Sequence, residues 1–289
     1  MPLCTLHLIS LHPTIALPTF LSTLKSSNLT PLVISHVVRW IILPTKISTE
    51  HLLARNIHWD ILLILPSTSA LPPPLIQQIA HHWSITAGIP SRLTQNFAAK
   101  NHALIHPDPG SVPPLRGDDA TKSTTSSAQN LELSADLNAW IDGAVERGGA
   151  EDLGAVSMFN LLSFNPGMKS SYLQYGAAFA AYIGSAHGGN AKLVGNVINT
   201  NGQPSLSRSS GTPATAGLTK VGELGGEWDE IALAHYPSIR HFRDMLTSAE
   251  YQRVNARFRV PSLRDTAILM TSEVGVEELM RGVGGGAKL

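Results

Sequence analysis

Leu6-His-Leu-Ile-Ser-Leu-His-Pro13 can be laid over Phe159-Asn-Leu-Leu-Ser-Phe-Asn-Pro166 without a gap. Each octapeptide is a mostly apolar stretch that ends in proline, which cannot continue a strand ladder, so each predicts a strand followed by a turn. Internal similarity fixes the architecture of a chain more firmly than any single motif. The match predicts that the chain contains one structural unit twice.

Two further pairs of segments follow the octapeptides in the same order. The pairs are Trp59-Asp60, an apolar run and Pro66 with Trp228-Asp229, an apolar run and Pro237, and then Ile89-Pro90-Ser91 with Val260-Pro261-Ser262. The spacing agrees only if the second copy has a longer loop before Trp228. We therefore expect a tandem duplication.

Composition places the boundary between the two copies. Residues 106–130 are mostly Pro, Gly, Ser, Thr and Asp and show no apolar periodicity, as is typical of a linker. The expected organisation is an N-terminal unit at 1–110, a linker with a lead-in helix at 111–150, a C-terminal unit at 151–280 and a tail at 281–289.

Each unit is expected to run strand, helix, strand, strand, helix, strand. In the second unit the strands are expected at 156–164, 192–199, 227–236 and 264–274, with helices at 169–186 and from 238 onward. In the first unit the corresponding strands are expected at 4–11, 32–43, 58–65 and 101–106, with helices near 18–25 and 74–83. A lead-in helix is expected at 134–147, with Ser134 before it and Gly148 after it.

This order predicts an α+β fold. A βαββαβ chain is the ferredoxin-like split unit, an antiparallel sheet with both helices on one face. The other face stays apolar and uncovered, at a cost of roughly 25 cal/mol per Å² of exposed apolar area, so such a unit needs a second sheet. Two units in one chain offer that partner internally and predict an intramolecular α/β barrel.

The second half resembles the dimeric α/β-barrel superfamily and, within it, uncharacterised families of the domain-of-unknown-function 1330 kind. The resemblance covers about residues 151–275 and is carried by Phe159-Asn-Leu-Leu-Ser-Phe, Tyr172-Leu-Gln-Tyr175-Gly, Lys192-Leu-Val-Gly195, Trp228-Asp-Glu-Ile-Ala-Leu, Tyr236-Pro-Ser-Ile-Arg-His-Phe, Ser248-Ala-Glu-Tyr251-Gln and Leu263-Arg-Asp-Thr-Ala-Ile-Leu269. It implies a barrel of two ferredoxin-like sheets, with a small-molecule cavity between sheet and helices. It implies no single reaction, because such relatives include lactone isomerases, quinol oxygenases and haem-dependent enzymes.

Three residues are candidates for catalysis: His235, Asn160 and Tyr175. His235 lies at the end of an expected strand, and its imidazole titrates near neutral pH, so it could shuttle a proton. Asn160 interrupts an apolar strand and, with Tyr175, could polarise a substrate carbonyl. A satisfied structural histidine and a structural amide are the competing interpretations.

Other residues are candidates for ligand contact: Tyr172, Trp228, Tyr236 and Arg264. The tyrosines of the 169–186 helix, with Phe179, form a stripe that either lines a pocket or belongs to the core. A cluster of arginines, Arg253, Arg257, Arg259 and Arg264, either clamps a carboxylate or forms a solvated helix face. The two tryptophans occupy matching places in the two copies, which also fits a shared packing role.

Charge and motifs exclude several classes of protein. The 21 basic and 21 acidic side chains give zero formal net charge, so no whole-molecule field favours nucleic acid or an anionic membrane. One cysteine, Cys4, excludes a disulfide framework and a multi-cysteine metal site. The apolar N-terminus has no basic region and is interrupted by His7, Pro13 and Pro18, so neither a signal peptide nor a membrane span is expected. No Walker, Rossmann, HExxH or GxSxG motif occurs, and no cofactor or metal is expected.

The final tripeptide resembles a targeting signal. Ala287-Lys288-Leu289 is similar to the Ser-Lys-Leu peroxisomal address and follows a run of glycines. We expect an import receptor to bind it and the protein to be peroxisomal, with the cytoplasm as the alternative.

The expected function is binding of a small hydrophobic, carbonyl-bearing metabolite, with cofactor-independent isomerisation or oxidation as its enzymatic form. One alternative is a non-catalytic binding or assembly module whose cavities are filled by their own side chains. Another is haem binding, which requires an accessible histidine facing an apolar cavity. Substrate and oligomeric state are left open.

Overall fold

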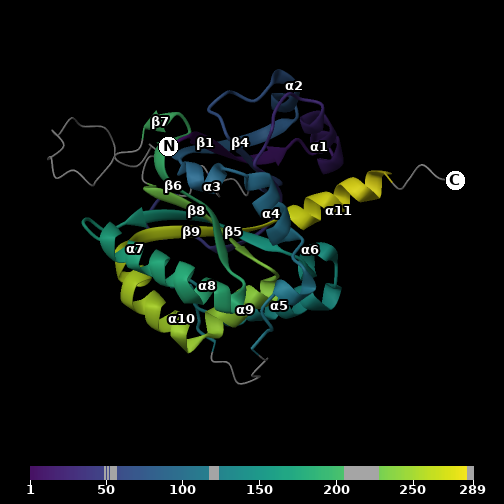
Figure 1. Ribbon diagram of the computed structural model, residues 1–289. Coiled ribbons are helices and arrows are strands. Elements are labelled where there is room, and N and C mark those ends of the chain that lie inside the picture. Colours follow the sequence, from purple (N-terminus) through teal and green to yellow (C-terminus); the bar gives the residue numbers. More distant parts are fainter. Residues whose placement is uncertain (49, 51, 53–56, 117–123, 205–227, 285–289) are drawn as a thin grey trace, which may run out of the picture.

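The computed structural model describes residues 1–48, 50, 52, 57–116, 124–204 and 228–284 (Figure 1). The strands are β1 (Leu3–Leu11), β2 (Val33–Ile42), β3 (Ile61–Leu65), β4 (Ile79–Gly88), β5 (Val156–Phe164), β6 (Asn190–Thr200), β7 (Gln203–Pro204), β8 (Glu230–Tyr236) and β9 (Leu263–Ser272). The α-helices are α1 (Leu17–Lys25), α2 (Pro73–Ile76), α3 (Ser91–Thr94), α4 (Phe97–Ile105), α5 (Ala135–Arg147), α6 (Ala150–Leu153), α7 (Lys169–Ala178), α8 (Gly184–His187), α9 (Ile239–Thr247), α10 (Ala249–Val254) and α11 (Glu273–Gly284). Two π-helical segments, Phe179–Ile183 and Asn255–Arg259, extend α7 and α10.

The strands form one antiparallel sheet in the order β4-β1-β3-β2-β9-β5-β8-β6-β7. β4 pairs in addition with β6, with Ala87 opposite Val197 and Gly88 opposite Asn196. The pairings that start at β4 therefore return to it, and among the described strands only the two-residue β7 lies outside this ring. The expected α+β class with an antiparallel sheet is confirmed.

Alternation of side chains along the strands divides the core into three buried clusters. One cluster draws on both halves of the chain and includes Leu6 and Leu8 of β1 together with Phe159 and Leu161 of β5. A second joins β5, β8 and β9 to α5, α7, α9 and α10, and a third joins β1 and β3 to α1, α2 and α11. Figure 1 shows α7, α8, α9 and α10 together below the sheet. These helices form one wall of the site described below.

Local sequence signals set several helix ends. The Ser134 hydroxyl accepts a hydrogen bond from the Leu137 amide at 3.1 Å and caps α5, which ends at Gly148 in the left-handed region (φ 71°). The Ser248 hydroxyl accepts from the Tyr251 amide at 3.3 Å and caps α10. Ser238 precedes α9, but its hydroxyl lies 2.8 Å from Nδ1 of His241 and does not cap the backbone.

Two expectations for the first half are wrong. The helix expected near 74–83 is present only as the short α2, and β4 begins at Ile79 within that range. Residues 101–106 lie almost entirely in α4, where a strand is expected. Trp83, Ile85 and Ala87 alternate on the buried face of β4, while His81 and His82 just before them are exposed and mask the two-residue period. The third pair of matched segments is therefore not equivalent, because residues 89–91 follow the last strand of the first half and residues 260–262 precede that of the second.

Some expectations fall on residues outside the described ranges. These are the C-terminal tripeptide, Ala287-Lys288-Leu289, and most of the loop at 200–226. Within the ranges that are described, no helix combines the length and apolar character needed to cross a membrane.

Candidate functional site

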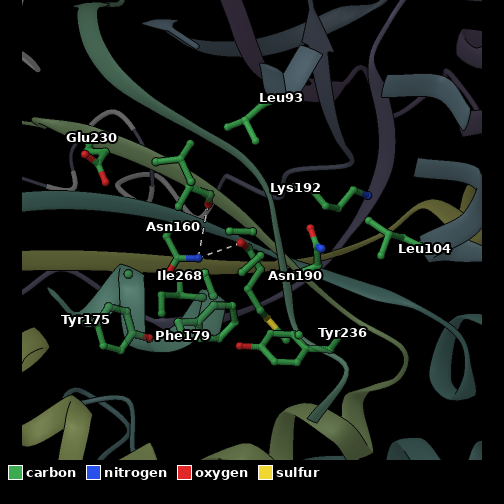
Figure 2. A pocket seen from close by; sticks show the side chains of 18 of the residues that line it. Leu93, Leu104, Asn160, Tyr175, Phe179, Asn190, Lys192, Glu230, Tyr236 and Ile268 are labelled. Carbon is green, nitrogen blue, oxygen red and sulfur yellow. Dashed lines mark hydrogen bonds between the residues drawn. The ribbon is translucent and has the colours of Figure 1, made fainter. Parts of the chain in front are cut away.

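A cavity of about 800 Å³ lies between the sheet and its covering helices. Strands β5, β6 and β8 supply one wall, α7 and its π segment a second, and α3 and α4 of the first half a third (Figure 2). Binding sites for small organic molecules typically enclose about 300–1,000 Å³ and are mostly apolar with a few polar groups. The cavity has this size and this character.

The sheet wall is built from alternate residues of two paired strands. Asn160 of β5 lies opposite Ala232 of β8, and Glu230 and Ala234 share the face of Ala232. The two alanines leave room above the sheet because their side chains end at Cβ. Asn160 Nδ2 donates to the Met158 carbonyl at 2.8 Å and to the Ala232 carbonyl at 3.4 Å (Figure 2).

These bonds change the role expected for Asn160. Both partners of its side-chain nitrogen are carbonyl oxygens, so the two amide hydrogens are used within the sheet. The atom that Asn160 leaves for a ligand is Oδ1, an acceptor. Asn160 is therefore placed to accept a hydrogen bond and not, as expected from the sequence, to polarise a carbonyl.

The helix wall is aromatic. Tyr172, Tyr175 and Phe179 recur at spacings of three and four residues, are buried and line the cavity. Leu173 also lines the cavity although it is 59% exposed, whereas Tyr182, which is 41% exposed, is not among the lining residues. The aromatic stripe expected from the sequence is thus the inner face of this helix, except at Tyr182. Single π-helical turns are frequent at functional sites, and this one follows directly after the tyrosines.

The buried phenols are neutral donors at physiological pH. Tyr175 and Tyr251 place their hydroxyl oxygens 3.4 Å apart, and the Tyr236 hydroxyl donates to Sδ of Met245 at 3.2 Å. Burial raises the pKa of Tyr172, Tyr175, Tyr236 and Tyr251, and the positive charge of Arg259 offsets this only in part. Each phenol can therefore donate a hydrogen bond without carrying charge.

One carboxyl group lines the cavity among the described residues. Glu230 is buried and pairs with Nζ of Lys169 at 3.3 Å. Burial raises the pKa of Glu230, and Lys169 lowers it to a smaller extent. A carboxyl group with a raised pKa beside an apolar cavity is a candidate for a general acid or base.

His235 is not in the cavity. Strand β8 directs Glu230, Ala232, Ala234 and Tyr236 toward the helices, so His235 points to the other face, where it is 1% exposed and its Nδ1 has no hydrogen-bond partner. Burial, and to a lesser extent the charges of Lys192 and His241, lowers the pKa of His235 to about 3. The structure therefore separates His235 from Asn160 and Tyr175, and a proton shuttle at this cavity has no geometric support.

Two of the expected ligand contacts lie elsewhere. Trp228 belongs with Trp59 to the buried cluster shared by the two halves, in line with the packing interpretation. Arg264 lines a smaller cavity of about 230 Å³, and its Nε donates to Oγ of Ser163 at 3.2 Å. Tyr172 and Tyr236, in contrast, line the large cavity with Asn160 and Tyr175.

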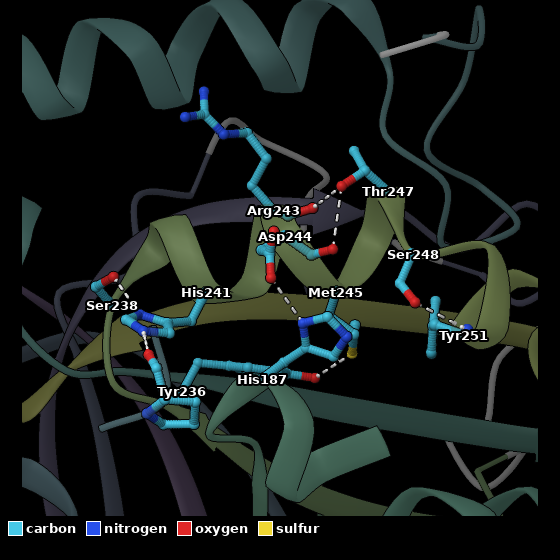
Figure 3. A network of polar contacts seen from close by, with 11 residues as sticks. His187, Tyr236, Ser238, His241, Arg243, Asp244, Met245, Thr247, Ser248 and Tyr251 are labelled. Carbon is cyan, nitrogen blue, oxygen red and sulfur yellow. Dashed lines mark hydrogen bonds and ion pairs between the residues drawn. The ribbon is translucent and has the colours of Figure 1, made fainter. Parts of the chain in front are cut away.

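A polar network beside the cavity contains Ser, His and Asp, the residue types of a catalytic triad, but it does not lie at the cavity. His187 Nδ1 lies 2.8 Å from Oδ2 of Asp244, and both side chains are buried (Figure 3). His241 bridges the Ser238 hydroxyl at 2.8 Å and the Pro113 carbonyl at 3.1 Å. None of these side chains is among the residues that line the two cavities, and Ser238 is buried. The network ties α8 and the linker to α9.

The geometry does not favour haem or a metal centre. Among the described residues that line the large cavity there is no histidine, which the haem alternative requires. No group of three His, Cys, Asp or Glu side chains in the described ranges is arranged to hold a metal ion.

Sequence reasoning missed one charged residue of the site and left the role of another open. Glu230 opens an apolar strand and drew no attention, whereas Arg259 belongs to the arginine cluster for which the sequence allows either a carboxylate clamp or a solvated helix face. The four-residue spacing of Tyr251, Asn255 and Arg259 places them on one face of a helix. In the structure all three are buried, while Arg253 and Arg257 are exposed.

Comparison with known proteins assigns no family. No protein-family model matches the chain, and no curated protein matches it. A solved protein of unknown function from Rhodopseudomonas palustris is similar over 48% of this chain and 92% of that one, at 18% sequence identity and a TM-score of 0.33. None of these findings names an activity, and the function proposed below follows from the cavity itself.

Proposed function

We propose that the chain binds a small hydrophobic organic molecule in the cavity between β5, β6, β8 and α7. The observation that carries this proposal is the cavity of about 800 Å³, lined by Tyr172, Tyr175, Phe179 and Tyr236. A protein interior is normally close-packed, with few voids larger than a water molecule. An open volume of this size with aromatic walls therefore favours a binding protein over an assembly module whose cavities are filled by their own side chains.

We also propose that the scaffold is a tandem pair of ferredoxin-like units closed into one α/β barrel. Each half has the order strand, helix, strand, strand, helix, strand, and within the sheet its fourth strand lies beside its first, then its third, then its second: β4-β1-β3-β2 and β9-β5-β8-β6. The two junctions, β2 with β9 and β4 with β6, each join the second strand of one unit to the fourth strand of the other.

Repeated hydrogen bonds support this duplication. The Leu11 amide donates to Oδ2 of Asp60 at 2.7 Å, and the Phe164 amide donates to Oδ2 of Asp229 at 2.7 Å. The amides of Asp60 and Asp229 donate in turn, at 2.8 Å, to the carbonyls of Ile9 and Leu162. Leu11 and Phe164 are equivalent in the aligned octapeptides, as are Ile9 and Leu162. The aspartate of each Trp-Asp pair thus makes the same two hydrogen bonds.

A second candidate function is isomerisation of the bound molecule, and the environment of Glu230 favours it. The Glu230 carboxylate would remove a proton from a carbon next to a carbonyl and return it to another carbon, with no net oxidation. Neutral phenols such as Tyr175 can stabilise the negative charge that develops on the carbonyl oxygen. In ²H₂O the ligand should incorporate deuterium when incubated with the protein, and Glu230→Gln should prevent this while the ligand still binds.

Ligand capture tests the binding proposal directly. Protein purified gently from its host should carry a small molecule that native mass spectrometry detects and that denaturation releases. Ala232→Phe fills the cavity from the sheet side and should abolish capture. Ala177→Phe makes the same change on the exposed face of α7 and should retain capture. Equal capture by both variants would contradict the proposed site.

Peroxisomal location stays a prediction from Ala287-Lys288-Leu289. A fluorescent protein fused in front of the full chain should collect in peroxisomes. A fusion that lacks residues 287–289 should stay diffuse, and identical distributions of the two fusions would refute the prediction.

A further inference from the structure

Arg259, at the end of the π segment Asn255–Arg259, is a buried cation at the cavity. Its side chain is 2% exposed and lines the cavity, and its Nη2 has no hydrogen-bond partner. No carboxylate in the described part of the chain forms an ion pair with it. Buried arginines are almost always paired, because an uncompensated charge in a protein interior is strongly unfavourable. The fold thus leaves a position for an anion.

The groups around Arg259 cannot supply the missing negative charge. Its charge acts on Tyr172, Tyr175, Tyr236 and Tyr251, yet burial raises the pKa of all four and keeps them neutral. The Glu230 carboxyl is engaged by Lys169 at 3.3 Å. The Asp265 carboxyl lines the smaller cavity together with Arg259, but it accepts hydrogen bonds from the backbone amides of Lys46 and Ile47 at 2.6 and 2.7 Å. The compensating anion must therefore come from outside the described chain.

The charged residues of the cavity wall are mostly basic. Four cations, Arg92, Lys100, Lys192 and Arg259, line it together with one acid, Glu230. Lys192 is neutralised by Glu273, and Lys100 donates to the Arg92 carbonyl at an exposed position. Arg259 is therefore the deeply buried cation that remains without a counterion.

We propose that Arg259 is the anion-binding group of this pocket and that the ligand is an organic carboxylate with an apolar or aromatic body. The planar guanidinium fork matches the two oxygens of a carboxylate, and the aromatic wall of α7 accommodates the apolar part. This inference rests on the proposed function, since it specifies the class of molecule that the cavity holds.

Two matched compounds test the inference on the full-length protein. Isothermal titration compares 2-naphthoate with 2-naphthamide, which has nearly the same size and no charge. The wild-type protein should bind the carboxylate about 10- to 100-fold more tightly, as expected for a hydrogen-bonded charge. Arg259→Met should abolish this preference, and Arg259→Lys should keep part of it. Arg257→Met, on the exposed side of the same segment, should leave it unchanged.

Thermal unfolding without ligand separates a binding role from a structural one. If Arg259 serves to bind an anion, its unpaired charge does not stabilise the ligand-free protein. Arg259→Met should then unfold at the same temperature as the wild type or at a higher one. A lower unfolding temperature would overturn the inference. The inference about Arg259 would also be overturned if the wild type bound both compounds equally well, or if Arg259→Met still preferred the carboxylate. In either case the pocket proposal would stand. If neither compound binds, both the pocket proposal and this inference are overturned.

Discussion

Closure of the sheet depends on a glycine at the junction of β4 and β6, and this dependence gives a sharp prediction. A Cβ on Gly195 would lie 2.9 Å from the Gly88 carbonyl oxygen and 2.9 Å from Cγ1 of Ile89, closer than carbon atoms normally approach. One of these contacts is with backbone, so it cannot be relieved by a side-chain rotation. Gly195→Ala must therefore push β4 away from β6.

The expected cost follows from these contacts. Overpacking a buried site typically costs about 1–3 kcal/mol, which exceeds the roughly 0.5–1 kcal/mol that alanine gains over glycine in a regular strand. At about 2–4 °C per kcal/mol, the net loss should lower the unfolding temperature by a few degrees. Circular dichroism measures this, and hydrogen exchange should show faster exchange of the amides that pair β4 with β6.

Gly176→Ala is the matched control. This helical glycine has no atom within 4 Å of its would-be Cβ, so the substitution should stabilise the protein by about 0.5–1 kcal/mol. The reasoning is refuted if Gly195→Ala is as stable as Gly176→Ala, or if exchange at the junction stays unchanged.

Two predictions concern buried ionisable groups. The pKa of His235 is lowered by burial to about 3, so between pH 6.5 and 3 the unfolded chain binds a proton that the folded protein does not, and stability rises with pH across this window. His235→Phe should reduce that slope by up to about 1.4 kcal/mol per pH unit in urea titrations, and an unchanged slope would contradict the assignment. Lys192→Met should destabilise the protein by about 3–5 kcal/mol because it leaves the buried Glu273 carboxylate without its cationic partner. Lys192→Met combined with Glu273→Met should recover most of this loss in the same urea titrations, and no recovery would refute the pairing.

Much of the fold could be predicted where sequence signals are local. The apolar run before Asn165-Pro166 predicts a strand at 156–164, and β5 has these bounds. Ser134 and Gly148 likewise predict the ends of α5. β4 was missed because exposed histidines interrupt its alternation. α4 was missed because the short apolar run at 103–105 suits a strand or a helix equally well.

The site was predicted in part. Asn160, Tyr172, Tyr175 and Tyr236 do meet at one cavity, as the sequence suggested. Neighbouring residues of a strand point to opposite faces, so the sequence alone shows that His235 and Tyr236 cannot both face the cavity. Which of the two does so follows only from the structure. The environment of Arg259 could not be predicted, since its burial depends on how the π segment packs against α7.

A crystal structure of the full-length protein with 2-naphthoate tests the central claim most directly, namely that this cavity is a binding site with Arg259 as its charged group. The account predicts density for the naphthalene ring beside Tyr172, Tyr175 and Phe179, with the carboxylate within hydrogen-bond distance of the Arg259 guanidinium. An empty cavity, or a naphthoate bound elsewhere on the protein, would contradict it.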